Sequence, residues 1–161
     1  MKNNGFTLAE MVAVITILMV LALLSVPFVR GYIDDSYNAK AQTFLRQFNE
    51  ACLNFERDYP GVKVSGDMSY TAPVGDCDLN NIYGRTEYVV APEILFQCHY
   101  LQIPTELEGR YTFKTGTSAS CSSCETDIRV SLLGGDNAGG AYKNKCACIN
   151  SIGELKKQEV D

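Results

Sequence analysis

The sequence has little that a catalytic site would need. It contains a single histidine, His99, which lies in a strand-like run with no catalytic companions in evidence. No Ser-His-Asp arrangement, glycine-rich phosphate loop or pair of catalytic carboxylates stands out. We therefore do not expect an enzyme, and the residues imply no cofactor.

Positive charge is outweighed by negative charge. The 161 residues include 14 Lys and Arg against 19 Asp and Glu, and the net charge of −5 gives no bulk attraction to nucleic acid or anionic lipid. Small basic groups occur at residues 143–145 and at residues 156–157. We interpret both groups as solvated surface, and nucleic acid is not expected as a partner.

A second long apolar run is missing, and so are internal repeats and low-complexity tracts. The one apolar run covers residues 6–29, and at about 1.5 Å per helical residue it exceeds a hydrocarbon core of roughly 30 Å. Four polar residues interrupt the run: Thr7, Glu10, Thr16 and Ser25. The pattern predicts one membrane helix with the polar remainder on one side of the membrane. That remainder has the length for one domain with a modest core.

A secretory signal peptide that is cut off and discarded is the ordinary alternative for such a segment. The apolar run is longer than a typical signal-peptide core, and no clear A-x-A-like site precedes a cut near Ser25 or Val26. Glu10 also argues against this alternative, because a carboxylate inside the membrane costs roughly 2.5–3.5 kcal/mol on insertion scales. A plain single-pass anchor allows the length but gives no reason for Glu10.

The first residues resemble a known processing signal. A short polar leader with Lys2 is followed by the sequence GFTLAE at residues 5–10, directly before the apolar helix. This arrangement is similar to that of type IV prepilins and pseudopilins. In that family a membrane aspartyl peptidase cuts after the glycine and methylates the new N-terminus. Family members carry a glutamate four residues after the new N-terminus and often a proline further along the helix.

The resemblance implies a cut between Gly5 and Phe6, with Phe6 as the methylated first residue. It assigns the family's glutamate to Glu10 and the helix proline to Pro27. The implied partners are the prepilin peptidase and methyltransferase, an inner-membrane pilus assembly machinery, and copies of the chain and other pilins in a helical filament. The implied location is the inner membrane for the precursor and the cell surface for the assembled pilus.

The physical chemistry of Glu10 and Pro27 agrees with these roles. A buried carboxylate must find a partner or lose its charge, and cleavage exposes a cationic amine on Phe6 at the same membrane depth. A neighbouring subunit's Glu10 can neutralise that amine and set the register between subunits. The alternative is a Glu10 that only reaches out to the headgroups. Pro27 lacks an N–H and clashes with the carbonyl of Leu23, which predicts a kink.

Beyond the apolar run, the helix is expected to continue over residues 30–57 as an amphipathic segment. Apolar side chains recur there mostly at spacings of three and four. They are Ile33, Tyr37, Ala41, Phe44, Phe48, Cys52 and Phe55. We interpret this stripe as the face on which a sheet packs, in preference to rings that conduct electrons along a filament. Residues 59–61 end a helix of about 78 Å.

The remaining residues, 58–161, are expected to form a globular, disulfide-containing, β-rich head after a leader at residues 1–5 and the helix at 6–57. Residues 62–85 are rich in Gly, Asp and Asn and suggest a long surface connection. Candidate strands are Glu87–Val90, Ile94–Leu101, Arg110–Lys114 and Ile128–Leu132, followed by a glycine-rich turn at 134–140 and the segment 141–149. The predicted fold class is α+β, a long helix packed on an antiparallel sheet, which is the plan that pilins share.

Seven cysteines are many for so short a chain, and they suit an oxidising compartment outside the cytoplasm. Because seven is odd, at least one thiol is free, metal-bound or paired between subunits. Cys52 is the candidate free thiol, since it lies on the apolar face of the helix and free cysteine buries well. Cys77 and Cys98 are candidates to pair across the long connection.

The other four cysteines form two close clusters, Cys121 with Cys124 and Cys146 with Cys148. Disulfides between the clusters are favoured, and they would tie the C-terminal segment to the sheet. Tetrahedral zinc is the alternative, although C-x-C is a less usual zinc motif and exported thiols tend to be oxidised. A redox C-x-x-C lacks the thioredoxin-like context it needs. The connectivity cannot be deduced from spacing alone.

Two groups of oxygen-bearing side chains are candidate calcium sites, namely Asp76, Asp78 and Asn80, and the pair Asp136 and Asn137. They matter because one pseudopilin branch uses a calcium loop. Neither group has the full ligand pattern of an EF-hand, so we interpret both as solvated turns and expect no metal.

Three functions are compatible with these observations. The first is a structural subunit of a type IV pilus, which a short disulfide-rich head favours. The second is a pseudopilin of a type II secretion system, which a calcium loop would favour. The third is a monomeric membrane-anchored binding or redox protein, for which Glu10→Ala would leave function intact.

Overall fold

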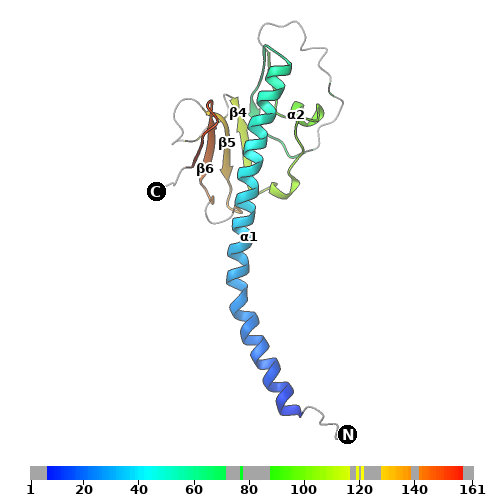
Figure 1. Ribbon diagram of the computed structural model, residues 1–161, viewed down its shortest axis with the longest axis vertical. Helices are drawn as coiled ribbons and strands as arrows, with labels where there is room; N and C mark the ends of the chain where they lie inside the picture. Colours follow the sequence, from blue (N-terminus) through cyan, green and yellow to red (C-terminus); the bar gives the residue numbers. More distant parts are fainter. Residues whose placement is uncertain are drawn as a thin grey trace.

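The computed structural model describes residues 7–71, 77, 88–116, 119, 121, 128–138 and 142–157. Its main feature is helix α1, Leu8–Asp58, which runs without interruption through 51 residues (Figure 1). Thr7 is its N-cap, and at its end the N–H of Tyr59 donates to the carbonyl of Phe55 at 2.9 Å. The chain then turns at Gly61, whose φ of 92° suits a glycine. The expected helix and its end are therefore confirmed.

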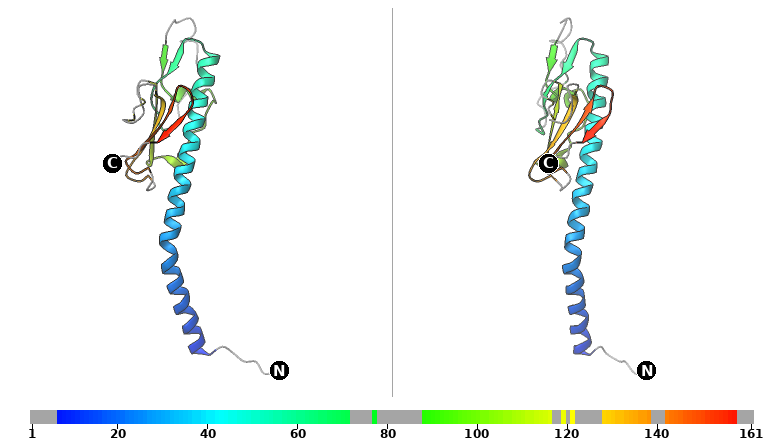
Figure 2. Two further views of the ribbon diagram at one scale, coloured as in Figure 1. Left: turned by 60° about the vertical axis from the view of Figure 1, so that its left-hand side comes forward. Right: turned by 90° about the vertical axis from the view of Figure 1, so that its left-hand side faces the viewer.

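The lower half of α1 stands clear of the rest of the molecule (Figures 1 and 2). Its large apolar side chains are exposed, from 43% for Ile33 to 83% for Leu8. This part is long and apolar enough to cross a membrane, and no other described segment buries it. We call Leu8–Ile33 the stem. The helix stays continuous through Pro27, and its ribbon curves gently within the stem (Figure 1).

The head contains a five-stranded antiparallel sheet that packs against the upper half of α1 (Figure 1). Its spatial order is β2-β4-β5-β6-β7. The strands are β2 Gly66–Asp67, β4 Tyr111–Thr115, β5 Ile128–Gly134, β6 Cys146–Asn150 and β7 Leu155–Lys157. Side chains alternate between the two faces of the sheet, and the inner face covers the helix. This sheet and the long helix confirm the α+β fold class.

Two short strands lie beside this sheet; one falls within the strand expected at Glu87–Val90, and the other was not foreseen. Strand β1, Val62–Val64, pairs in parallel with β3, Tyr88–Val90, with Lys63 opposite Val89. The segment 62–85, expected as an irregular connection, therefore begins with the strands β1 and β2. Residues of that segment from 72 onward lie outside the described part, apart from Cys77.

The strand expected at Ile94–Leu101 is wrong. The structure has a short helix there, α2, Glu93–Gln97, followed by a turn at His99 with φ 59° and then by the 3-10 helix η1, Thr105–Leu107. Leu95 and Phe96 are both buried although they are adjacent, a pattern that no half-buried strand gives. A short apolar run fits a buried helix or a strand equally well, and its surroundings decide.

The core lies between α1 and the inner face of the sheet. Phe44 and Phe48 of α1 pack on Phe113 of β4, with the Phe44 and Phe113 ring centroids 4.8 Å apart in an edge-on arrangement. Higher up, the Phe55 ring lies 5.4 Å from that of Tyr100. Phe44, Phe48 and Phe55 belong to the aromatic stripe of the sequence, and their rings pack in the core of the head.

The turn after β5 depends on one glycine. Gly134 donates to the carbonyl of Lys145 at 2.9 Å, which closes the loop between β5 and β6. A Cβ at this position would lie 1.9 Å from the carbonyl oxygen of Tyr142, so no other residue fits without moving the backbone.

Candidate functional site on helix α1 and the disulfide-bound head

The start of α1 is built by a reciprocal capping box. The Thr7 side chain accepts from the N–H of Glu10 at 3.3 Å, and the Thr7 N–H donates back to Glu10 Oε2 at 2.8 Å. The Thr7 hydroxyl also donates to the same oxygen at 2.8 Å. A threonine followed three residues later by glutamate is the sequence signature of this motif, which satisfies backbone N–H groups that the helix itself leaves open.

The capping box places Glu10 on the stem in a defined orientation. Its carboxylate lies in the first turn, where the partial positive charge of the helix N-terminus favours an anion. The side chains around it along the helix are apolar and exposed, including Leu8, Met11 and Val14. A carboxylate therefore stands at one end of an apolar rod of membrane length. Gly5 and Phe6, where cleavage and methylation are expected, lie outside the described residues.

The cysteines of the head are largely in disulfides. Cys77 is bonded to Cys98, 21 residues later at the end of α2, and Cys121 is bonded to Cys146 on β6. Cys148 is also disulfide-bonded, whereas Cys124 lies outside the described residues. Bonded sulfurs are not thiolate ligands, so Cys121, Cys146 and Cys148 do not offer a zinc site.

The disulfides form a second apolar cluster on the outer face of the sheet. Ala147 and Ile149 of β6 face α1 and belong to the main core. Cys146 and Cys148 alternate with them and point to the other face, where they pack with Cys121 and the half-buried Ile128. The helix thus covers one face of β6 and sulfur bridges cover the other.

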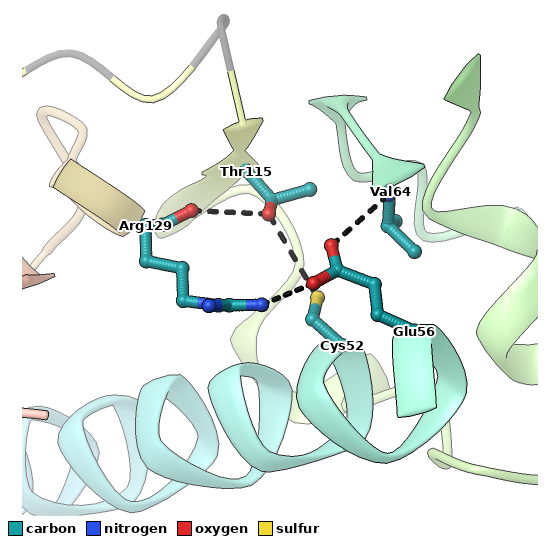
Figure 3. A network of polar contacts seen from close by, with 5 residues as sticks. All are labelled: Cys52, Glu56, Val64, Thr115 and Arg129. Atoms are coloured by element: carbon teal, nitrogen blue, oxygen red, sulfur yellow. Dashed lines mark hydrogen bonds and ion pairs between the residues drawn. The ribbon is translucent and has the colours of Figure 1, made fainter. Parts of the chain in front are cut away.

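Cys52 is free and buried, and it belongs to a polar network that the sequence did not reveal (Figure 3). Burial raises the pKa of its thiol to about 12, although a contact of its sulfur with Thr115 Oγ1 at 3.8 Å acts in the opposite direction. Thr115 in turn donates to the carbonyl of Arg129 at 3.1 Å. A thiol with so high a pKa is a packing group and not a nucleophile.

Glu56 joins three elements in the same network (Figure 3). Its carboxylate forms an ion pair with Arg129 of β5 and accepts the N–H of Val64 in β1 at 3.4 Å. Both charged side chains are about three-quarters buried, at 26% exposure. Glu56 and Arg129 are 73 residues apart, so no local pattern could have indicated the pair.

Two grooves run along α1, between the helix and the segment 99–107. The lower one, about 500 Å³, lies between α1 and the segment 103–107, and an ion pair between Lys40 and Glu106 joins its two walls. Hydrogen bonding to Glu106 raises the pKa of Lys40. The upper one, about 420 Å³, includes Glu50 and the exposed His99. Among the described residues, no group of three or more metal-binding side chains gathers in either groove.

The remaining candidate residues are accounted for as follows. Asp136 and Asn137 are exposed in the turn after β5, where the Asn137 carbonyl accepts from Arg110 at 2.9 Å. Asp76, Asp78 and Asn80 lie outside the described residues. Of the basic groups, Lys143 and Lys156 are exposed.

Fold and site together define the class of protein. A membrane-length apolar stem continues without a break into the helix on which a small disulfide-bound antiparallel sheet packs, and a capped glutamate stands near the start of the stem. This layout is consistent with the pilin fold.

Comparison with known proteins supports this class. Residues 1–26 match the family model described as the prokaryotic N-terminal methylation motif, which is the prepilin signal of type IV pilins and pseudopilins. A comparison with curated proteins and one with solved structures found no match. The chain therefore carries the signal of a type IV pilin or pseudopilin precursor, and the motif implies processing by a prepilin peptidase and assembly into pilin-type filaments.

Proposed function

We propose that this chain is a structural subunit of a type IV pilus. The peptidase cuts between Gly5 and Phe6, Phe6 is methylated, and the mature chain polymerises through its stem. The observation that carries this proposal is the position of Glu10, a carboxylate within the prepilin signal and on an exposed apolar rod.

Glu10 gives subunits a reason to associate in one register. A carboxylate inside a membrane costs roughly 2.5–3.5 kcal/mol on insertion scales, and the amine that cleavage creates on Phe6 carries the opposite charge at the same depth. When two copies stagger along a filament axis, the Glu10 of one copy neutralises the amine of the next. Each charge then has a partner in a dry environment, which ties assembly to prior cleavage.

The stem supplies the area for association. In a monomer outside the membrane its exposed side chains, such as Leu23 and Phe28, would face water, which is strongly unfavourable. Side-by-side packing of stems from several copies covers them. The precursor therefore resides in the inner membrane with its head outside the cytoplasm, and an assembly machinery in that membrane adds subunits at the base of a surface filament. The chain acts as a building block and not as an enzyme.

The disulfide-bound head favours a pilus over a type II secretion pseudopilus. Disulfides stabilise a small domain that is exposed to the medium. In the described part of this head, Cys77 is bonded to Cys98, and Cys121, Cys146 and Cys148 are also in disulfides. A demonstrated calcium loop in the head would turn the assignment to a pseudopilin.

Intact and N-terminal peptide mass spectrometry of the sheared surface fraction tests the proposal. The expected result is a chain that starts at methylated Phe6 and is abundant in sheared fibres. A chain that starts at Phe6 but stays in the envelope, with secretion lost on its deletion, would indicate a pseudopilin. A chain that starts at Met1 or near Val26 would refute the prepilin assignment.

Glu10→Ala provides the second test. Because the Phe6 amine then has no partner in the filament interior, the yield of sheared filaments should fall by more than about tenfold, while the head keeps its fold. Glu50→Ala is the matched control, since Glu50 is an exposed glutamate on the same helix but in its upper half. A normal filament yield for Glu10→Ala would remove the role proposed for Glu10 and would favour a monomeric anchor.

A further inference from the structure

The two oxygens of the Glu10 carboxylate are not equivalent. The Thr7 N–H and the Thr7 hydroxyl both donate to Oε2, each at 2.8 Å. Within the described residues, Oε1 has no hydrogen-bond partner. Because a carboxylate has lone pairs on both oxygens, one oxygen is held by the chain itself while the other remains an acceptor for a donor from outside.

We propose that Thr7 is a positioning residue for subunit assembly, which holds Oε2 so that Oε1 of Glu10 accepts the terminal amine of another copy. This inference rests on the proposed function. It adds that the hydroxyl of Thr7 contributes to assembly through Glu10.

The capping box survives processing. The bond that is cut precedes Phe6, so the peptide N–H of Thr7 and its hydroxyl are both present in the mature chain. The acceptor of the incoming amine is therefore preformed before two copies meet. A preformed acceptor loses less conformational freedom on binding than a glutamate with freely rotating χ angles, and this is how a remote hydroxyl affects association.

The geometry also limits how the carboxylate behaves in the monomer. Two donors on Oε2, one of them a hydroxyl, partly satisfy the charge while the mature subunit waits in the membrane. The other oxygen keeps its acceptor capacity, and an ammonium group is the donor that pairs best with it. The same two residues, Thr7 and Glu10, thus act in the membrane-resident subunit and in the assembled one.

Thr7→Val is the direct test, because valine keeps the shape and removes the hydroxyl. The measured quantity is the ratio of mature chain in sheared filaments to mature chain in the membrane, so that any change in cleavage is divided out. Loss of one hydrogen bond to a charged group should lower this ratio by about tenfold. Thr7→Ser, which keeps the donor, should restore it to near the wild-type ratio.

Thr16→Val is the matched control. The Thr16 hydroxyl also lies on the stem, but it donates to the carbonyl of Ala13 at 2.8 Å and does not touch Glu10. The same substitution there should leave the assembled ratio unchanged. A merely structural contribution of hydroxyls to the stem would instead lower the ratio in both valine variants to a similar extent.

The outcomes separate this inference from the proposed function. If wild-type chains start at methylated Phe6 and form filaments, and Thr7→Val assembles as well as wild type, the positioning role is wrong and the pilus assignment stands. If wild-type chains are not processed or not found in filaments, the pilus assignment itself fails. Because residue 7 follows the cut closely, Thr7→Ala is made in parallel; loss of cleavage in both variants would assign Thr7 to peptidase recognition and overturn the proposal.

Discussion

The buried thiol of Cys52 makes the stability of the head depend on alkaline pH in a calculable way. In the folded head, loss of solvent raises the pKa of this thiol from 9.0 to about 12, while in the unfolded chain the thiol titrates near its ordinary value. Below pH 9 both states hold the proton, so the thiol makes no pH-dependent contribution. Between pH 9 and 12 only the unfolded chain releases its proton, and the free energy of unfolding falls as pH rises.

The size of the effect follows from the two pKa values. At pH 10 the unfolded thiol is one unit above its pKa and the folded thiol is about two units below, so the head should lose about 1.4 kcal/mol of stability relative to pH 7. The raised pKa values of Tyr70 and Tyr142 add losses of the same sign at higher pH, since both phenols are also partly buried. These tyrosine contributions are present in any Cys52 variant and cancel in a comparison.

Cys52→Ala is therefore compared with wild type by urea unfolding of the purified chain in detergent, followed by far-UV circular dichroism at pH 7 and pH 10. The variant should be less stable at pH 7 because the side chain leaves a small cavity. Its additional loss at pH 10 should be smaller than that of wild type by about 1.4 kcal/mol. An equal pH dependence in the two proteins would show that Cys52 is accessible to water and that the burial argument fails.

Two further perturbations address how the head is held together. Arg129→Met removes the cation that pairs with Glu56 and should lower the free energy of unfolding by about 1–3 kcal/mol. Adding Glu56→Gln in the same chain should recover part of this loss. If the losses of the two single variants simply add in the double variant, the two side chains do not interact. Replacing Cys77 and Cys98 together by alanine opens a loop of sequence separation 21, and the added entropy of the unfolded chain should lower the free energy of unfolding by about 3 kcal/mol. Thermal unfolding of the intact chain measures this loss, and an unchanged unfolding midpoint would contradict it.

The long helix and the central strands could be predicted because their patterns are local and extended. The apolar stripe repeats over about six turns from Ile33 to Phe55. The alternation of buried and less buried side chains in Tyr111–Thr115 is typical of a half-buried strand. The processing signal was equally visible, because it is a contiguous motif. In each case residues that are close in the sequence are enough to predict the feature.

The parts that sequence reasoning missed depend on distant partners. Strand β1, Val62–Val64, has three residues and exists because Tyr88–Val90 pairs with it from across a long connection. The apolar run at Ile94–Leu101 has no period of its own, so burial of adjacent side chains decides for a helix. The spacing of the cysteines indicated two clusters but no connectivity, and the ion pair of Glu56 lies beyond any local pattern.

One consequence of the unbroken helix concerns the angular phase between stem and head. Since no loop intervenes between Ile33 and Tyr37, the number of residues alone sets which way the head faces when the stem is seated among its neighbours. A single residue inserted there would rotate the head by about 100° about the axis and lift it by about 1.5 Å. Seven inserted residues would lift it by about 10 Å while turning it by only about 20°. The number of residues in the helix therefore determines the orientation of the head, and with it which surface of the head the filament exposes.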